Sequence, residues 1–236
     1  MNNELYKEFS KVYDGLNCSN YSLLMGSIIL KYLNEKHPDE NFKKNLDICC
    51  GTGELCNFFM NNNINSKGVD ISEDMITVAR DKFPNIEFII DDVTTYQCNE
   101  KYDFVTCFND ALNHITDVES LKSTINNISN YVRKNGLFIF DINNYNSLNY
   151  EKYSSRQIGG RELTFHFHRD NKLITCDIEY LENGDVIWCK TAFEREYYVD
   201  ELALILNNAG FVIETCSQYF YEDEETIKWK FVTRKI

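Results

Sequence analysis

The segment that most constrains the fold is a short apolar run followed by a turn with two glycines. Residues 46–54 read Leu-Asp-Ile-Cys-Cys-Gly-Thr-Gly-Glu, which predicts a buried strand and then a helix that begins at Glu54. Gly51 and Gly53 permit a tight turn and let a ligand approach the main chain with no Cβ in the way. A strand, a glycine turn and a helix in this order are typical of sites that hold nucleotide-like ligands at the carboxyl end of a parallel sheet.

Two carboxylates near this turn indicate which ligand it holds. Asp47 lies just before the turn, and Asp70 ends a second predicted strand. A dinucleotide site needs a third glycine so that a pyrophosphate can approach the helix, and Cys56 stands at that position. A carboxylate at position 47 repels a pyrophosphate but attracts an ammonium group, and one at position 70 is placed to accept both ribose hydroxyls. These residues favour S-adenosylmethionine, which carries an ammonium and a sulfonium but no phosphate, over NAD.

The two acids and the glycine turn resemble motif I and the ribose-binding acid of the class I S-adenosylmethionine-dependent methyltransferases. Four further segments resemble that family in the family's order: residues 71–76, 91–93, 101–107 and 136–141. The resemblance covers roughly residues 5–145 and the closing strands. It implies that the cofactor is held by Tyr13, Tyr21, Asp47, Cys49, Gly51, Thr52, Gly53, Asp70, Ile71, Met75, Asp91, Asp92, Val93 and Phe108.

Composition and charge narrow the possible partners. The 236-residue chain has a net charge of −13 and no run rich in lysine or arginine, whereas nucleic-acid binding needs a basic surface. Its longest apolar runs are far shorter than a membrane span. We therefore expect neither nucleic acid nor a membrane as a partner. Residues 1–4 show no signal-peptide pattern, and nine scattered cysteines without a Cys-x-x-Cys pair suit a reducing compartment, so we expect a cytoplasmic protein.

The order of the predicted elements indicates a doubly wound α/β fold. Strands are predicted at 45–49, 66–70, 86–90, 102–108 and 137–142, and helices between them at 54–62, 72–82 and 117–134. A helix at 200–208 and strands at 211–220 and 226–235 close the chain. Alternation with short connections is typical of a parallel sheet. We therefore predict one methyltransferase domain, residues 1–236, with a seven-stranded, mostly parallel, Rossmann-like sheet.

Two segments stand outside this alternation. Residues 1–36 hold two predicted helices, which we expect to form a cap over the cofactor. The family resemblance implies that Tyr13 and Tyr21 close over the methionine end of the cofactor, and ordinary core packing of both rings is the alternative. Residues 145–199 hold three β-patterned runs joined by hairpin turns, which predict an antiparallel insert. The insert could serve as a lid, as a homodimer interface, or as both.

The segment after the fourth predicted strand holds the candidates for the acceptor side. His114 is predicted to take a proton from an amine acceptor, because imidazole exchanges protons near neutral pH; helix capping or packing is the alternative. Asp110 is a possible partner for a cationic acceptor. Asn113, which stands where the family often has a glycine, is a further candidate for substrate contact. Tyr13 is expected to cover the sulfonium.

Two further groups of side chains are weaker candidates. Tyr145, Tyr150 and Tyr153 lie in a tyrosine-rich stretch that could line the acceptor pocket or simply pack. His166 and His168 alternate on one predicted strand and so share a face. Because the sequence shows no third ligand near them, we interpret both as exposed or lid-facing residues and expect no metal site.

The resemblance implies methyl transfer from S-adenosylmethionine to a small-molecule acceptor. A match to the amino-sugar N-methyltransferases favours an amine as the acceptor. O-methylation and a regulatory protein that binds the cofactor without catalysis are alternatives. A third alternative is an NAD-dependent reductase, but the missing third glycine argues against it.

Overall fold

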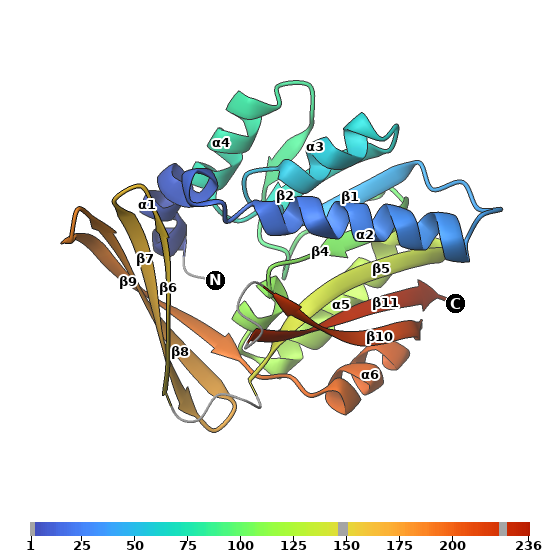
Figure 1. Ribbon diagram of the computed structural model, residues 1–236. Helices are drawn as coiled ribbons and strands as arrows, with labels where there is room; N and C mark the ends of the chain where they lie inside the picture. The colour runs from blue at the N-terminus through green and yellow to red at the C-terminus, as the bar shows by residue number, and fades with distance from the viewer. Residues whose placement is uncertain (1–2, 146–150, 222–225) are drawn as a thin grey trace.

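The computed structural model describes residues 3–145, 151–221 and 226–236. These residues contain six α-helices and eleven strands (Figure 1). The helices are α1 (Asn3–Tyr13), α2 (Asn20–Lys36), α3 (Glu54–Asn61), α4 (Glu73–Lys82), α5 (Val118–Tyr131) and α6 (Val199–Asn208). Two short 3₁₀ turns are η1 (Asp14–Leu16) and η2 (Ala111–His114). None of the described helices combines the length and the apolar character needed to cross a membrane.

Seven strands form the main sheet. They are β1 (Lys44–Ile48), β2 (Asn65–Asp70), β3 (Phe88–Ile90), β4 (Tyr102–Cys107), β5 (Val132–Asn144), β10 (Phe211–Tyr221) and β11 (Thr226–Lys235). Their spatial order is β10-β11-β5-β4-β1-β2-β3. Strands β1 to β5 are parallel, and β11 pairs antiparallel with both β5 and β10. The structure thus confirms the predicted doubly wound, mostly parallel sheet.

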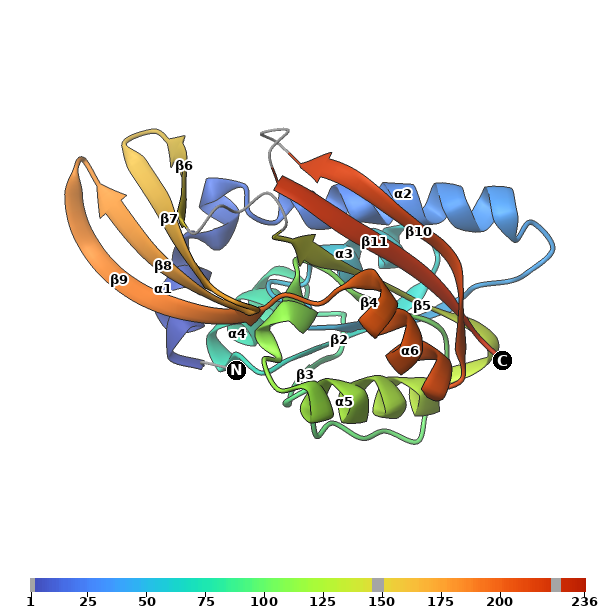
Figure 2. The same ribbon diagram turned by 90° about the horizontal axis from the view of Figure 1, so that it is seen from below.

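Helices cover both faces of this sheet, which explains the apolar sequence of its central strands (Figure 2). On β4, Phe104 packs on the α2 and α3 side, with its ring 5.1 Å from that of Phe59. The next residue, Val105, faces the core that α5 and α6 cover. All three side chains are fully buried, and burial of such a side chain contributes about 1.5–3 kcal/mol to folding.

The predicted insert is confirmed as a second, antiparallel sheet, but it has four strands where three were predicted. They are β6 (Glu151–Ile158), β7 (Arg161–Asp170), β8 (Leu173–Glu182) and β9 (Asp185–Arg195), in the order β6-β7-β8-β9. The sequence did not reveal β6, because this edge strand is polar and its residues are alternately exposed and half-buried. Residues 146–150 of the predicted insert, including Tyr150, lie outside the described residues.

The second sheet lies beside α1, at the end of the molecule where β1, β2 and β4 have their carboxyl ends (Figures 1 and 2). Its inner face packs on α1 through apolar side chains, among them Trp188, whose ring is 6.2 Å from that of Phe9. The sheet and α1 therefore enclose the space above the predicted cofactor turn.

The boundary between α5 and β5 differs from the prediction. The helix ends at Tyr131 and the strand begins at Val132, whereas a helix to residue 134 with Asn135-Gly136 as its cap was expected. Asn135 does have a left-handed φ of 62°, but it lies within β5, where the register with β4 shifts. The left-handed residue therefore accommodates an irregular strand pairing and does not end the helix.

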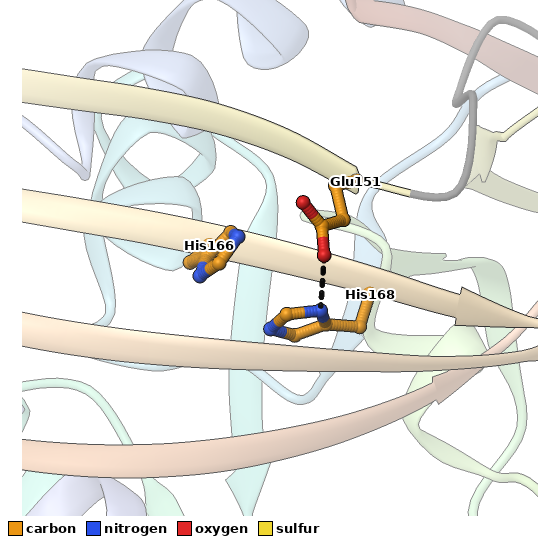
Figure 3. A group of neighbouring side chains, drawn as sticks. All are labelled: Glu151, His166 and His168. Carbon is orange, nitrogen blue, oxygen red and sulfur yellow. Dashed lines mark ion pairs between the residues drawn. The ribbon is translucent and has the colours of Figure 1, made fainter.

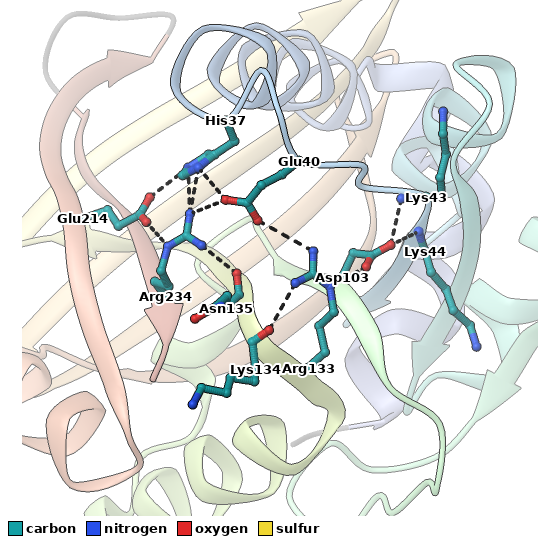
Figure 4. Close-up of polar contacts among 10 residues, drawn as sticks. All are labelled: His37, Glu40, Lys43, Lys44, Asp103, Arg133, Lys134, Asn135, Glu214 and Arg234. Carbon is teal, nitrogen blue, oxygen red and sulfur yellow. Dashed lines mark hydrogen bonds and ion pairs between the residues drawn. The ribbon is translucent and has the colours of Figure 1, made fainter.

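A polar network at the opposite end of the sheet fastens the C-terminal end of α2 to the closing strands (Figure 4). Arg234 on β11 pairs with Glu214 on β10, and its Nη2 lies 3.0 Å from Glu40 Oε1. His37, which follows α2, lies 3.0 Å from the carboxylate of Glu214 through Nε2. The helix that carries the predicted cap tyrosine Tyr21 is thus anchored by charge pairs far from the cleft.

Candidate functional site

The glycine turn forms the floor of a cleft at the carboxyl ends of the parallel strands. Gly51 and Gly53 have left-handed φ angles of 54° and 81°, a conformation that favours glycine. A Cβ at Gly53 would lie only 2.6 Å from the ring of Phe88, so packing requires glycine there. A Cβ at Gly51 would meet no atom within 4 Å, because Gly51 lines the cleft. Its main chain is therefore open to a ligand.

Asp47 is a buried carboxylate at the base of this cleft, 3% exposed. Burial raises its pKa to about 7, and a hydrogen bond of 2.6 Å from Thr106 Oγ1 opposes that shift. Within the part of the chain that the structure describes, no lysine, arginine or histidine forms an ion pair with it. A ligand cation at this position would favour the ionised carboxylate.

Asp70 lies on the adjacent strand end and is held by the main chain. Its two oxygens accept hydrogen bonds from the Gly51 and Ser72 amides, at 2.8 and 2.9 Å. Burial raises its pKa, and these backbone hydrogen bonds act against burial. An ionised carboxylate offers about four lone-pair sites, so Asp70 keeps acceptor capacity for a ligand donor such as a ribose hydroxyl.

The structure brings most of the predicted cofactor residues together. The cleft is lined by Tyr13, Asp47, Cys49, Gly51, Thr52, Asp70, Ile71, Met75 and Phe108. Five others do not line it: Tyr21, Gly53, Asp91, Asp92 and Val93. The last three follow β3 at the same sheet edge, where Asp92 accepts two hydrogen bonds of 2.8 Å from Thr94 and Val93 is buried in the core. Their contact with the adenine stays a prediction.

The N-terminal segment covers the cleft and is tied to the glycine turn. The Asn109 side chain donates a hydrogen bond of 3.2 Å to the Tyr13 hydroxyl. Thr52 in the turn donates one of 2.9 Å to Asp14, and Lys82 pairs with the same carboxylate. Burial raises the pKa of Tyr13, so its hydroxyl stays neutral. Tyr13 therefore lines the cleft, and its contact with the sulfonium stays a prediction.

A second cavity of about 280 Å³ lies next to the cleft, between α1 and the inner face of the second sheet. Its apolar wall consists of Phe9, Phe165, Phe167, Cys176, Ile178 and Ala192. Its polar residues include Asp110, His114, Asn143, Arg156, Glu194 and Lys228. Four residues border both the cleft and this cavity: Tyr6, Tyr13, Asn109 and His114. A group transferred from one to the other would pass between these four side chains.

One wall of the cavity carries a buried charge cluster. Lys228 on β11 pairs with Asp110, and its Nζ lies 3.9 Å from Asp141. Burial acts to lower the pKa of Lys228, but the two carboxylates outweigh it and raise that pKa. Asp141 is fully buried and accepts hydrogen bonds from the Tyr21 and Tyr219 hydroxyls. Lys228 is therefore a fixed cation that compensates Asp110 and Asp141.

Glu194 on β9 is a third carboxylate, and it lines this cavity. It is 5% exposed, and its Oε2 accepts hydrogen bonds from Tyr145 and, at 3.4 Å, from Asn143. Burial raises its pKa, while nearby His114 lowers it. Glu194 can therefore hold a proton, or it can pair with a cation that enters the cavity.

His114 lies at the boundary between the two spaces. Its Nδ1 is 3.3 Å from the Phe193 carbonyl oxygen, which can only accept a hydrogen bond. This arrangement assigns the proton to Nδ1 and leaves Nε2 with a free lone pair. Single donor atoms of Asp110, His114 and Glu194 lie within 4.8 Å of one another. A metal ion would have to compete with Lys228 for Asp110, so this group suits a proton or an ammonium ion better.

Two of the predicted acceptor contacts lie outside the cavity wall. Asn113 is fully buried, and its amide donates to the Arg195 carbonyl at 2.9 Å and accepts from the Asn143 amide at 3.0 Å. It therefore joins β5 to β9 and presents nothing to an acceptor. Tyr145 is buried too, and its hydroxyl hydrogen-bonds to two residues that line the cavity, Glu194 and Asn143. Asp110 and His114 do line the cavity, and their contact with an acceptor stays a prediction.

Several residues that line the cleft and the second cavity were not predicted from the sequence. Tyr6 stands at i, i+3 and i+7 spacing with Phe9 and Tyr13, a pattern that could have indicated one common helix face. Glu194 and Lys228 had no comparable signal, because each reaches the cavity only through the pairing of strands far apart in the chain.

Comparisons with known proteins agree with this architecture. Residues 46–136 match the family model described as a methyltransferase domain. A Geobacillus sp. (strain WCH70) protein, named only provisionally as a methyltransferase, is 31% identical over 142 residues, which cover 58% of this chain and 57% of that protein. The chain spans about half the length of this relative and of a malonyl-[acyl-carrier protein] O-methyltransferase from Ilyobacter polytropus that it also matches.

Solved structures match over nearly the whole chain. An S-adenosylmethionine-dependent methyltransferase from Clostridium acetobutylicum superposes with a TM-score of 0.81 at 22% identity, covering 98% of this chain and 99% of the other. An amino pentose methyltransferase of calicheamicin biosynthesis from Micromonospora echinaspora gives 0.77 at 16% identity, covering 95% and 97%. At these identities the likeness establishes the shared fold, including the second sheet.

Proposed function

Residues 46–136 match the methyltransferase-domain family model, and on this basis we propose that the chain is a class I S-adenosylmethionine-dependent methyltransferase that methylates an amine nitrogen of a small molecule. The observation that carries the proposal is the cavity beside the cleft. It brings a buried acid, Glu194, close to the imidazole of His114, one of the residues that border both spaces.

The residues of the cleft fit the cofactor. Gly51 leaves its main chain open, Asp47 lacks a cationic partner among the described residues, and Asp70 keeps acceptor capacity. We assign Asp47 to the ammonium group, Asp70 to the ribose and Tyr13 to the sulfonium end. S-adenosylmethionine supplies an activated methyl group, so the protein contributes alignment and a site shielded from water.

The second cavity, to which we assign the acceptor, provides a carboxylate, a proton acceptor and an apolar wall for a protonated amine. An alkyl ammonium ion would enter toward Glu194, which carries negative charge when ionised, because Asp110 is already paired with Lys228. Before it can react, the nitrogen must lose a proton so that its lone pair is free. His114 Nε2 is placed to take that proton, and Glu194 would stabilise the resulting imidazolium. The apolar wall of phenylalanines, Ile178 and Ala192 suits the carbon skeleton of the acceptor.

Removal of His114 tests this assignment. We expect His114→Ala to lower turnover by about 10²–10⁴-fold, the range for loss of a general base, with cofactor affinity unchanged. The assay uses S-adenosylmethionine with a panel of small amines and detects the methylated product by mass spectrometry. Cofactor affinity is measured by calorimetry, with Asp70→Ala as the variant that should lose it.

The same panel decides between the alternatives. It should include an alcohol analogue of each amine, and methylation of the alcohols alone would replace our proposal by O-methylation. If none of the compounds is methylated although the cofactor binds, a regulatory role gains support. A thermal-shift comparison of S-adenosylhomocysteine with NAD tests the alternative of an NAD-dependent reductase, because that alternative requires NAD to raise the Tm of the protein.

We also infer that the protein works in the cytoplasm and on neither nucleic acid nor membranes. All nine cysteines are free, as in a reducing compartment. The net charge of −13 opposes binding to polyanions. Cell fractionation with an antibody to the chain tests the location.

A further inference from the structure

We propose that the outer face of the second sheet binds one divalent transition-metal ion, such as Zn²⁺, through Glu151, His166 and His168. Figure 3 shows these side chains together on the same side of β6 and β7. One donor atom from each residue lies within 4.8 Å of the other two. The site is separate from the cleft and the acceptor cavity, and it does not rest on the proposed methyl transfer.

Strand pairing creates this group. His166 and His168 are two residues apart on β7, so both project from one face, and their ring centroids are 4.1 Å apart. Glu151 lies directly opposite His168 in the register of β6 with β7. Its Oε1 is 3.7 Å from His168 Nδ1. The third ligand that was missing from the sequence pattern therefore comes from β6, the strand that the sequence did not reveal.

The spacing allows coordination after small side-chain rotations. Zinc bonds to imidazole nitrogen and carboxylate oxygen are about 2.0–2.2 Å long, so tetrahedral ligand atoms stand roughly 3.4 Å apart. The Glu151–His168 pair is already near that separation. The side chain of Glu151 is 70% exposed and that of His168 41%, so both have room to turn. Solvent can complete the coordination shell.

A second carboxylate supports the ligand geometry. Asp177 on β8 lies opposite His166 in register, and its Oδ2 is 3.8 Å from His168 Nε2. Thr191 on β9 donates a hydrogen bond of 2.6 Å to the other oxygen of Asp177 and so orients it. A carboxylate on one ring nitrogen directs the other nitrogen to a metal, which is the usual second layer of such sites. Nδ1 of His168, on the side of Glu151, is then the ligand atom.

The ligand set indicates the class of metal. Two imidazoles and one carboxylate suit zinc and the neighbouring first-row divalent ions, whereas Mg²⁺ and Ca²⁺ prefer oxygen ligands throughout. Three protein ligands leave at least one position open to water. No thiol belongs to the group.

Bound metal would fasten edge strand β6 to β7. The opposite face of these two strands carries Ser154, Arg156, Phe165 and Phe167, all of which line the acceptor cavity. Metal binding would therefore hold the outer wall of that cavity in one register. This consequence follows from the alternation of side chains along a strand.

Calorimetry with ZnCl₂ on the full chain, stripped of metal with a chelator, tests the site. We expect one ion per chain, at least tenfold weaker binding for His168→Ala, and 10–100-fold weaker binding for Asp177→Asn. Glu162→Gln is the matched control, because it removes one acid from the same face of β7 outside the group and should leave binding unchanged.

Two results would overturn the proposal. One is the absence of stoichiometric binding by the wild-type chain. The other is unchanged binding by the double variant His166→Ala/His168→Ala, which would assign the ion to thiols or other surface groups. Circular dichroism and thermal unfolding in chelator show whether each variant is folded, since the substituted side chains lie on an outer face. The Co²⁺ absorption spectrum gives a second readout, because thiolate ligation adds an intense charge-transfer band in the near ultraviolet.

Discussion

At the scale of single residues, the buried carboxylate of Asp47 makes cofactor binding depend on pH. Because burial raises its pKa to about 7, a large fraction is protonated in the free protein near neutral pH. A bound ammonium favours the ionised form, so binding should release a proton. Affinity for the cofactor should therefore rise as the pH increases from 6 to 8, by up to about tenfold per pH unit below the pKa of Asp47. Calorimetry in buffers of different ionisation enthalpy measures the proton release.

Asp47→Asn is the variant that checks this linkage. It retains the shape of the side chain and should bind the cofactor weakly, with little change of affinity between pH 6 and 8. A wild-type affinity that is flat over this range would remove Asp47 from the ammonium site. The neighbouring acid Asp70 also has a raised pKa, so a residual pH dependence in the variant would be assigned to it.

The site residues that could be predicted from the sequence are those that lie close to one another along the chain. Asp47, the glycine turn and Asp70 belong to one strand–helix–strand unit, so their order and spacing imply their proximity. Glu194 and Lys228 differ, because each is one charged residue in an ordinary strand pattern. Only the folded sheets show that they share a cavity with His114.

At the scale of elements, the charge network around Arg234 should contribute to the anchoring of α2. We expect Arg234→Met to lower the free energy of unfolding by about 2 kcal/mol, because Glu40 and Glu214, both half-buried, lose their shared partner. For a chain of this size that corresponds to a fall of roughly 4–8 °C in Tm. Differential scanning calorimetry measures the shift.

The control for this prediction is an exposed pair on the same helix. Lys31 and Glu35 are 3.9 Å apart with side chains 74% and 58% exposed. Lys31→Met should therefore change stability by at most about 0.5 kcal/mol. Equal effects of the two substitutions would show that the network contributes no more than a surface ion pair.

Elements with a strong apolar pattern were predictable, and a polar edge strand was not. Strands β3, β4 and β5 appeared in the sequence as apolar runs because helices cover both faces of the sheet. β2 is largely polar and was predicted from its place after the glycine turn. β6 has neighbours on one side only and carries polar residues such as Ser154 and Ser155. Its existence depends on pairing with β7, which composition does not encode.

At the scale of the whole molecule, the second sheet offers a surface for self-association. Its edge strand β9 carries Ile187 and Phe193, which are 54% and 50% exposed. Exposed apolar edge strands readily pair with another chain. We therefore predict a homodimer through β9, seen as twice the chain mass in light scattering coupled to size-exclusion chromatography.

Ile187→Lys should convert this dimer to a monomer by placing like charges at the interface. Leu204→Lys on α6 is the control, because Leu204 is 63% exposed but lies away from the second sheet. A monomeric wild-type chain at micromolar concentration would contradict the prediction. A dimer that survives Ile187→Lys would place the interface elsewhere.

The two halves of the site come from separate parts of the architecture. The parallel sheet supplies the floor of the cleft, and the antiparallel sheet supplies most of the apolar wall of the adjoining cavity. Under the proposed function, changes in strands β6 to β9 would alter which acceptor is methylated and leave the cofactor site intact. Residues 151–195 should therefore be exchangeable as a unit. Replacing them by the equivalent strands of a related enzyme should transfer that enzyme's acceptor preference to this protein.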